Sequence, residues 1–173
     1  MHKLHLLRHA KSSWKDDVAD HQRHLSKRGR EAARLIGEHL VGAVGNIGLV
    51  LCSSAVRTRE TLELVIARFQ KRPPCWIEDG LYLADCDKLI ERLAQIDEGV
   101  FTVLLIGHNP GLHQLSLALA EPHSPSFPVL ANGKFPTLAC ASFEISTRWS
   151  AIGEVRHRLI DYVTPASLSW DAN

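Results

Sequence analysis

Short runs of apolar residues alternate along this chain with longer segments in which apolar residues recur every three or four positions. The runs are typical of strands covered on both faces, and the longer period is typical of amphipathic helices. The expected strands cover residues 4–7, 47–52, 76–77, 102–106, 138–145 and 152–163. The expected helices cover residues 25–44 and 54–69, and two more open at Asp85 or Asp87 and at Asn109-Pro110. This order predicts a three-layer α/β/α sandwich with a mostly parallel central sheet, helices on both faces and two final antiparallel strands.

Capping and helix-breaking residues predict where several elements begin and end. Ser26 is expected to cap the first helix, and Ser53 or Ser54 the second. Pro73-Pro74 is expected to end the second helix, and Pro110 to occupy the first turn of a later one. The segment 121–136 holds four of the eight prolines, which favours a long loop.

Size and composition indicate an ordinary globular chain. With 173 residues, 45% of them hydrophobic, the chain is expected to form a single domain over 1–173. A net charge of +1 argues against a general nucleic-acid or membrane-surface binder. No apolar stretch reaches the roughly 20 residues of a membrane span, and the first residues lack a signal-peptide pattern. The four cysteines have no CxxC spacing, so reduced thiols and a cytoplasmic location are expected.

Basic residues follow three of the expected strands. Arg8-His9 comes directly after the first strand, Arg57 comes shortly after the second, and His108 follows the strand at 102–106. Arg59 also follows the second strand, but we expect it to be a solvated surface residue. The carboxyl ends of parallel strands share one edge of an open α/β sheet, and ligands bind there. The sequence therefore predicts one anion site at this edge.

Phosphoryl transfer is the chemistry that suits these residue types. Arg is permanently charged and pairs with two phosphate oxygens at once, and a neutral imidazole can attack phosphorus to form a covalent intermediate. On this reasoning His9 is the nucleophile, while Arg8, Arg57 and His108 hold the phosphoryl oxygens. His108 would serve best when protonated, and a nearby dianion favours that state. This chemistry requires no metal and no cofactor.

Four motifs extend this hypothesis to a family. They are Leu-Leu-Arg8-His9-Ala10-Lys11-Ser12-Ser13-Trp14, then residues 20–30, then Ser53-Ser54-Ala55-Val56-Arg57-Thr58-Arg59-Glu60-Thr61, then Gly107-His108-Asn109-Pro110-Gly111-Leu112. Together they resemble the histidine phosphatase superfamily, which is phosphoglycerate-mutase-like, and within it the SixA-type protein-phosphohistidine phosphatases. The resemblance implies a catalytic His9 beside Arg8, with Arg57 and His108 as the other catalytic residues. It also implies substrate binding by Arg8, Arg23, Arg57, His108 and Asn109.

The chain departs from the family pattern where many members carry a glutamate general acid. The stretch Leu81-Tyr82-Leu83 places Leu83 at that position, and the neighbouring acids Glu78, Asp79 and Asp85 do not match it. An alkoxide leaving group needs a proton from an acid, whereas imidazole is a much better leaving group. The resemblance therefore implies that the substrate is phosphohistidine on a protein, such as a phosphotransfer domain or a phosphocarrier.

Several alternatives remain open at this stage. The substrate could be a small phosphomonoester or another activated phosphate, or the protein could be a non-catalytic phosphate-binding regulatory module. A cysteine phosphatase is disfavoured, because only four residues separate Cys52 from Arg57 where the motif needs five. A metallohydrolase would have to use the cluster Asp20-His21-Gln22-Arg23-His24, which reads as a loop without a metal-ligand spacing.

Overall fold

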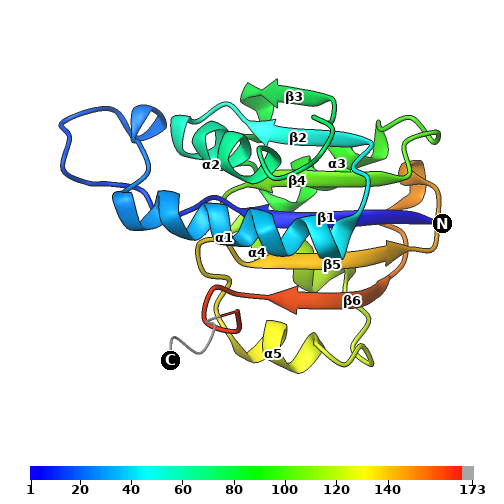
Figure 1. Ribbon diagram of the computed structural model, residues 1–173. Coiled ribbons are helices and arrows are strands. Elements are labelled where there is room, and N and C mark those ends of the chain that lie inside the picture. Colours follow the sequence, from blue (N-terminus) through cyan, green and yellow to red (C-terminus); the bar gives the residue numbers. More distant parts are fainter. Residues whose placement is uncertain (169–173) are drawn as a thin grey trace.

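A computed structural model describes residues 1–168 of the chain (Figure 1). Its centre is a six-stranded sheet with the order β3-β2-β4-β1-β5-β6. The strands are β1 (His2–Arg8), β2 (Leu49–Ser53), β3 (Cys75–Glu78), β4 (Thr102–Gly107), β5 (Cys140–Ile145) and β6 (Arg158–Val163). Strands β1 to β4 run parallel, whereas β5 is antiparallel to both β1 and β6.

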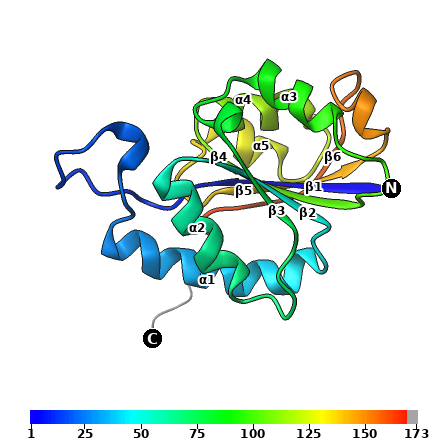
Figure 2. The same cartoon turned by 90° about the horizontal axis from the view of Figure 1, so that it is seen from above.

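Helices cover both faces of this sheet (Figure 2). The helices α1 and α2 lie on one face, and α3, α4 and α5 lie on the other. They are α1 (Lys27–Val44), α2 (Val56–Ile66), α3 (Cys86–Ala94), α4 (Gly111–Leu119) and α5 (Phe127–Asn132). The three-layer α/β/α sandwich expected from the sequence is therefore confirmed. No helix among residues 1–168 is long and apolar enough to cross a membrane.

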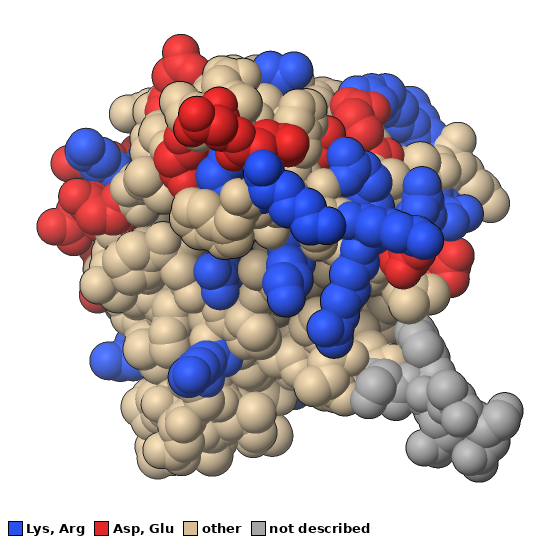
Figure 3. Space-filling view, turned by 90° about the vertical axis from the view of Figure 1, so that its left-hand side faces the viewer, with Lys and Arg blue, Asp and Glu red and all other residues tan. Residues whose placement is uncertain are grey.

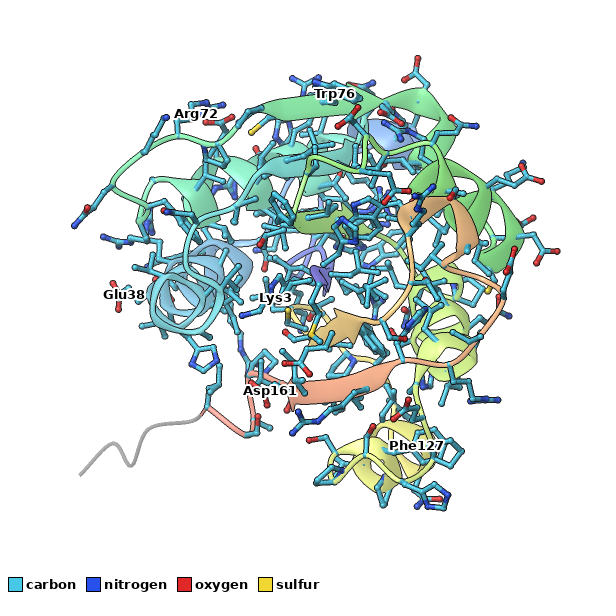
Figure 4. All side chains as sticks on the ribbon, turned by 90° about the vertical axis from the view of Figure 1, so that its right-hand side faces the viewer. Lys3, Glu38, Arg72, Trp76, Phe127 and Asp161 are labelled. Carbon is cyan, nitrogen blue, oxygen red and sulfur yellow. The ribbon has the colours of Figure 1, made fainter. Side chains whose placement is uncertain are left out.

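The two faces of the sheet carry separate hydrophobic clusters. Successive strand residues point to opposite faces, so Leu104 packs toward α1 and α2 while Leu105 packs toward α3 and α4. Edge strand β3 carries Trp76, and edge strand β6 carries Asp161, with Phe127 of α5 beyond it (Figure 4). The interior strands β2, β4 and β1 are held on both sides, which makes their carboxyl ends rigid supports.

The predicted cap of the first helix is confirmed, and that of the second is wrong. The Ser26 hydroxyl accepts a hydrogen bond from the backbone N–H of Gly29 at 3.0 Å. Helix α2 begins at Val56 after Ala55, without a side-chain cap, because the Ser53 hydroxyl lies instead against His108. The same helix ends at Ile66, well before the proline pair that was expected to end it.

Three further expectations about the second half of the chain need correction. Pro110 precedes the first turn of α4 instead of occupying it. The segment 121–136 is not a continuous loop, because α5 forms within it, with Pro128 in the first turn where its missing N–H costs nothing. The last strand begins at Arg158 instead of Ile152, because residues 152–154 form a turn that follows the 3-10 turn at Trp149–Ala151.

Candidate active site

The sheet brings the three basic strand ends together. Strand β4 lies between β2 and β1, with Cys52 opposite Ile106 and Arg8 opposite Gly107. The backbone N–H of His9 then donates to the Gly107 carbonyl at 3.1 Å, which sets His9 beside His108. The two imidazole ring centres are 5.2 Å apart.

A cavity of about 280 Å³ opens at this edge. All six residues that the sequence assigned to the site line it: Arg8, His9, Arg23, Arg57, His108 and Asn109. The other lining residues are Lys11, Ser12, Trp14, Leu83 and Thr137. Lys and Arg side chains gather on the face of the molecule toward which β1, β2 and β4 run (Figure 3). Arg59, by contrast, is exposed and does not line this cavity.

The two ring nitrogens of His9 have different partners. Its Nδ1 donates to the Ala10 carbonyl at 2.7 Å, so Nε2 carries the lone pair in the neutral ring. The Arg57 Nε–H donates toward this Nε2 at 3.3 Å. Burial, helped by the charges of Arg57 and Arg8, lowers the pKa of His9 to about 4. At neutral pH His9 is therefore an uncharged imidazole with a lone pair on Nε2.

Arg57 is the buried centre of the cluster. Besides His9, its guanidinium donates to the backbone carbonyl of Asp20 at 2.8 Å and to the Asp20 carboxylate at 3.0 Å. It also approaches His108 Nδ1 at 3.4 Å. Arg57 lies in the first turn of α2, where the helix dipole adds to the positive potential. A single side chain thus links both histidines to the loop that precedes α1.

His108 is held from the other side by Ser53. The Ser53 hydroxyl and His108 Nε2 are 2.7 Å apart, and both groups are buried. Burial first, and then the neighbouring His9 and Arg57, lower the pKa of His108 to about 3. His108 is therefore neutral at neutral pH in this arrangement. A phosphate dianion in the cavity would oppose the effect of the cations and favour its protonation.

Arg8 and Asn109 share one backbone acceptor. The Arg8 guanidinium donates to the Phe135 carbonyl at 2.9 Å, and the Asn109 amide donates to the same oxygen at 2.8 Å. The Nε of Arg8 and the Oδ1 of Asn109 are buried without a hydrogen-bond partner in the described part of the chain. These two side chains therefore form a wall of the cavity that is tied to the segment around Phe135.

Asp20 and Tyr82 belong to the site, although sequence reasoning did not assign them to it. The Asp20 carboxylate accepts hydrogen bonds from Arg57, from Arg23 and from the Tyr82 hydroxyl. The bond from Tyr82 is the main cause that lowers the pKa of Asp20 to about 2, and Arg23 and Arg57 act in the same direction. The position of Asp20, three residues before Arg23 in one of the family-like motifs, was the signal that could have found it.

An apolar side chain lines the cavity within the stretch where the sequence lacks the family's glutamate. Leu83 lines the cavity and has a positive φ of 50°. Glu78 instead binds Arg92 at 2.7 and 2.8 Å, and Asp85 caps α3. Asp79 is exposed, and none of these three acids lines the cavity. Among residues 1–168, no carboxylic acid lines the cavity.

The rival nucleophile and the rival metal cluster do not assemble. The Cys52 thiol is buried, and its burial raises the pKa to about 12, so the thiolate that a cysteine phosphatase needs is disfavoured. His21 contacts the Ser54 hydroxyl at 2.8 Å, whereas His24 contacts Glu60 at 2.7 Å. These two histidines therefore point to different partners rather than to a shared ligand position.

Two arginines and two neutral histidines at the carboxyl edge of an α/β sandwich are the fold and site of a phosphatase. The model of the histidine phosphatase superfamily (branch 1) matches residues 4–99, and the chain belongs to this superfamily.

Known proteins resemble the chain over nearly its whole length. An uncharacterized protein of Mycobacterium tuberculosis is 32% identical over 161 residues, covering 92% of this chain and 99% of the relative. A proposed phosphohistidine phosphatase SixA from Nakamurella multipartitia superposes with a TM-score of 0.83 at 26% identity, covering 95% and 96% of the two chains. The protein histidine phosphatase SixA complexed with tungstate gives a TM-score of 0.78 at 24% identity, covering 96% and 99%, and shows likeness of fold.

Proposed function

We propose that this protein hydrolyses phosphohistidine on a partner protein through a covalent phosphohistidine intermediate on His9. One observation carries the proposal. A neutral His9, whose Nδ1 donates to the Ala10 carbonyl, lines a cavity together with Arg8, Arg57 and His108, and the apolar Leu83 lines the same cavity. The likeness to the SixA phosphatases supports the same substrate class.

In the first step, His9 Nε2 attacks phosphorus opposite the leaving nitrogen. A bond forms between Nε2 and phosphorus while the bond from phosphorus to the substrate imidazole breaks. The charge of the transferring group is spread over its three equatorial oxygens, which need cationic donors already in place. Arg8 and Arg57 supply permanent charges, and His108 becomes a further charged donor once the dianion raises its pKa.

The leaving group explains why Leu83 is tolerated. When the second nitrogen of the substrate ring takes a proton from solvent, cleavage of the bond to phosphorus releases a neutral imidazole. No acid at the leaving atom is then required, whereas an alkoxide would need one. The chemistry therefore favours phosphohistidine over an alkyl phosphomonoester.

In the second step, water attacks the phosphoryl group on His9. The bond between His9 Nε2 and phosphorus breaks, the water oxygen becomes part of inorganic phosphate, and its proton passes to solvent. The His9 ring returns to the neutral state that its Nδ1 bond to Ala10 maintains. All charge stabilisation in this scheme comes from side chains of the chain, so we assign no role to a metal.

The experiment is a rapid quench at alkaline pH, using a radiolabelled phosphohistidine protein with wild type and with His9→Ala. Wild type should carry a transient acid-labile, alkali-stable label and release phosphate. His9→Ala should show neither, whereas the exposed control His123→Ala should behave like wild type. Turnover retained by His9→Ala would refute the mechanism. Hydrolysis of small phosphomonoesters alone would refute the substrate class, and binding without any turnover would indicate a regulatory module.

A further inference from the structure

A second hollow adjoins the catalytic cavity. It has a volume of about 550 Å³ and shares Arg8, Lys11, Asn109 and Thr137 with that cavity. The residues that line only this hollow are His113, Gly133, Lys134, Phe135 and Pro136. A substrate whose phosphoryl group lies against Arg8 could therefore extend into this space without leaving the protein surface.

The hollow is electropositive at its rim. Lys11 and Lys134 both line it and are exposed, and neither ammonium group pairs with a carboxylate among residues 1–168. No acidic residue of the described chain belongs to the lining. Two ammonium groups without a local counter-ion favour an anionic ligand.

Both lysines stand on backbone that is fixed relative to the catalytic cavity. The carbonyl of Lys134 accepts from the Tyr162 hydroxyl at 2.8 Å, and the next carbonyl, that of Phe135, accepts from Arg8 and Asn109. The buried Phe135 ring stacks on His113, with ring centres 5.8 Å apart. Lys134 is therefore attached to the same hydrogen-bond system that positions Arg8.

Lys11 is fixed from the opposite side. Its carbonyl accepts from the backbone N–H of Ser26 at 2.9 Å and from the Ser26 hydroxyl at 3.1 Å. A Cβ at Gly29 would lie only 2.1 Å from this carbonyl oxygen, so the first turn of α1 packs closely against it. The lysine side chains can move, but the points from which they extend are set by the fold.

We infer that this hollow is a substrate subsite, in which Lys11 and Lys134 bind a carboxylate of the partner protein next to its phosphohistidine. The inference rests on the proposed function and adds a sequence preference to it. Because both ammonium groups are exposed, each ion pair contributes modestly, and the pair together should change affinity by about tenfold.

The test uses two peptides that carry a non-hydrolysable phosphonate analogue of phosphohistidine. One has glutamates flanking the analogue and the other has glutamines, and the dissociation constants are measured by fluorescence anisotropy. Wild type should bind the glutamate peptide about tenfold more tightly, and added salt should reduce the difference. The double variant Lys11→Gln/Lys134→Gln should bind both peptides alike, whereas the control Lys88→Gln, an exposed lysine on α3 outside the hollow, should keep the preference.

Equal binding of the two peptides by wild type would overturn the inference, as would a preference that survives in the double variant. Turnover of phosphoramidate by wild type and by the Lys88→Gln control separates this result from failure of the proposed function. Circular dichroism and thermal unfolding of the double variant, which should match those of wild type, separate it from misfolding. A glutamate preference in a protein that hydrolyses neither phosphoramidate nor phosphohistidine would refute the proposed function while supporting the subsite.

Discussion

The catalytic cavity has buried residues at the strand ends and exposed residues around its mouth, here called the rim. The two groups are held in place in different ways. His9, Arg57 and His108 are buried, and interior strands or a helix start hold them in place. The rim contains Trp14, a residue that is 79% exposed. The segment between β1 and α1, to which it belongs, extends away from the sheet (Figure 1). The buried part suits chemistry, because its donors need no reorganisation, whereas the exposed part suits recognition of a large partner.

The largest difference in kcat/KM is expected between substitution of a buried arginine and substitution of an exposed one. Arg57→Ala removes one of the buried donors that would bind the phosphoryl oxygens, and kcat/KM on phosphohistidine should fall by about 100- to 1000-fold. Arg59→Ala removes an exposed arginine two residues later on the same helix and should change kcat/KM by less than about twofold. Steady-state kinetics on both variants provide the measurement. Similar losses in the two variants would mean that the first turn of α2, rather than Arg57 itself, matters.

The pH dependence of stability should distinguish the buried histidines from the rim carboxylate. Burial lowers the pKa values of His5 and His9 to about 4 and that of His108 to about 3, so the unfolded chain binds more protons below pH 6.5. The free energy of unfolding should therefore fall by on the order of a few kcal/mol as the pH drops from about 6.5 to about 4. The contribution of Asp20, whose pKa is lowered to about 2, should be lost only below about pH 3.8.

Urea denaturation between pH 7 and pH 3 measures this profile. A constant free energy of unfolding between pH 6.5 and pH 4 would contradict the burial of neutral histidines. NMR titration of the histidine ring protons provides an independent check, because the pKa values of His9 and His108 should both lie well below the usual value for histidine.

Removal of the Ser53 hydroxyl should have an intermediate effect. It is the partner of His108 Nε2 at 2.7 Å, and Ser53→Ala leaves this buried ring nitrogen without its partner. A loss of about tenfold in kcat is expected from one buried hydrogen bond worth about 1.4 kcal/mol. The neighbouring Ser54→Ala is a matched control, since Ser54 contacts His21 instead. An equal loss in both variants would indicate damage to the strand end, not to His108.

The smallest change is expected at the rim. Tyr82→Phe removes the hydroxyl that donates to Asp20, so the pKa of Asp20 should rise and its hold on Arg57 should loosen. Because the site is partly exposed, kcat/KM should fall by only about two- to fivefold. Kinetics at neutral pH and an NMR titration of Asp20 measure both effects. A loss as large as that of Arg57→Ala would mean that Tyr82 and Asp20 contribute directly to phosphoryl transfer.

Much of the site could be predicted because its residues follow strands. The short apolar runs identify the strands, and parallel strands must share a carboxyl edge, so His9, Arg57 and His108 could be grouped without coordinates. Asp20 and Ser53 could not be assigned in this way. Asp20 begins a 3-10 turn, Asp20–Gln22, that is too short to show a period in the sequence, and Ser53 resembles a helix cap in sequence. Only the observed hydrogen bonds therefore reveal their partners.

The sequence by itself determined the layered α/β architecture, the family and the residues that gather at the carboxyl edge. Local pattern suffices there, because hydrophobic period and strand polarity act over a few residues. Tertiary structure alone decided the neutral state of both histidines, the link from Arg57 to Asp20, and the hollow between Lys11 and Lys134. Those properties depend on burial and on contacts between residues far apart in sequence, which local pattern does not encode.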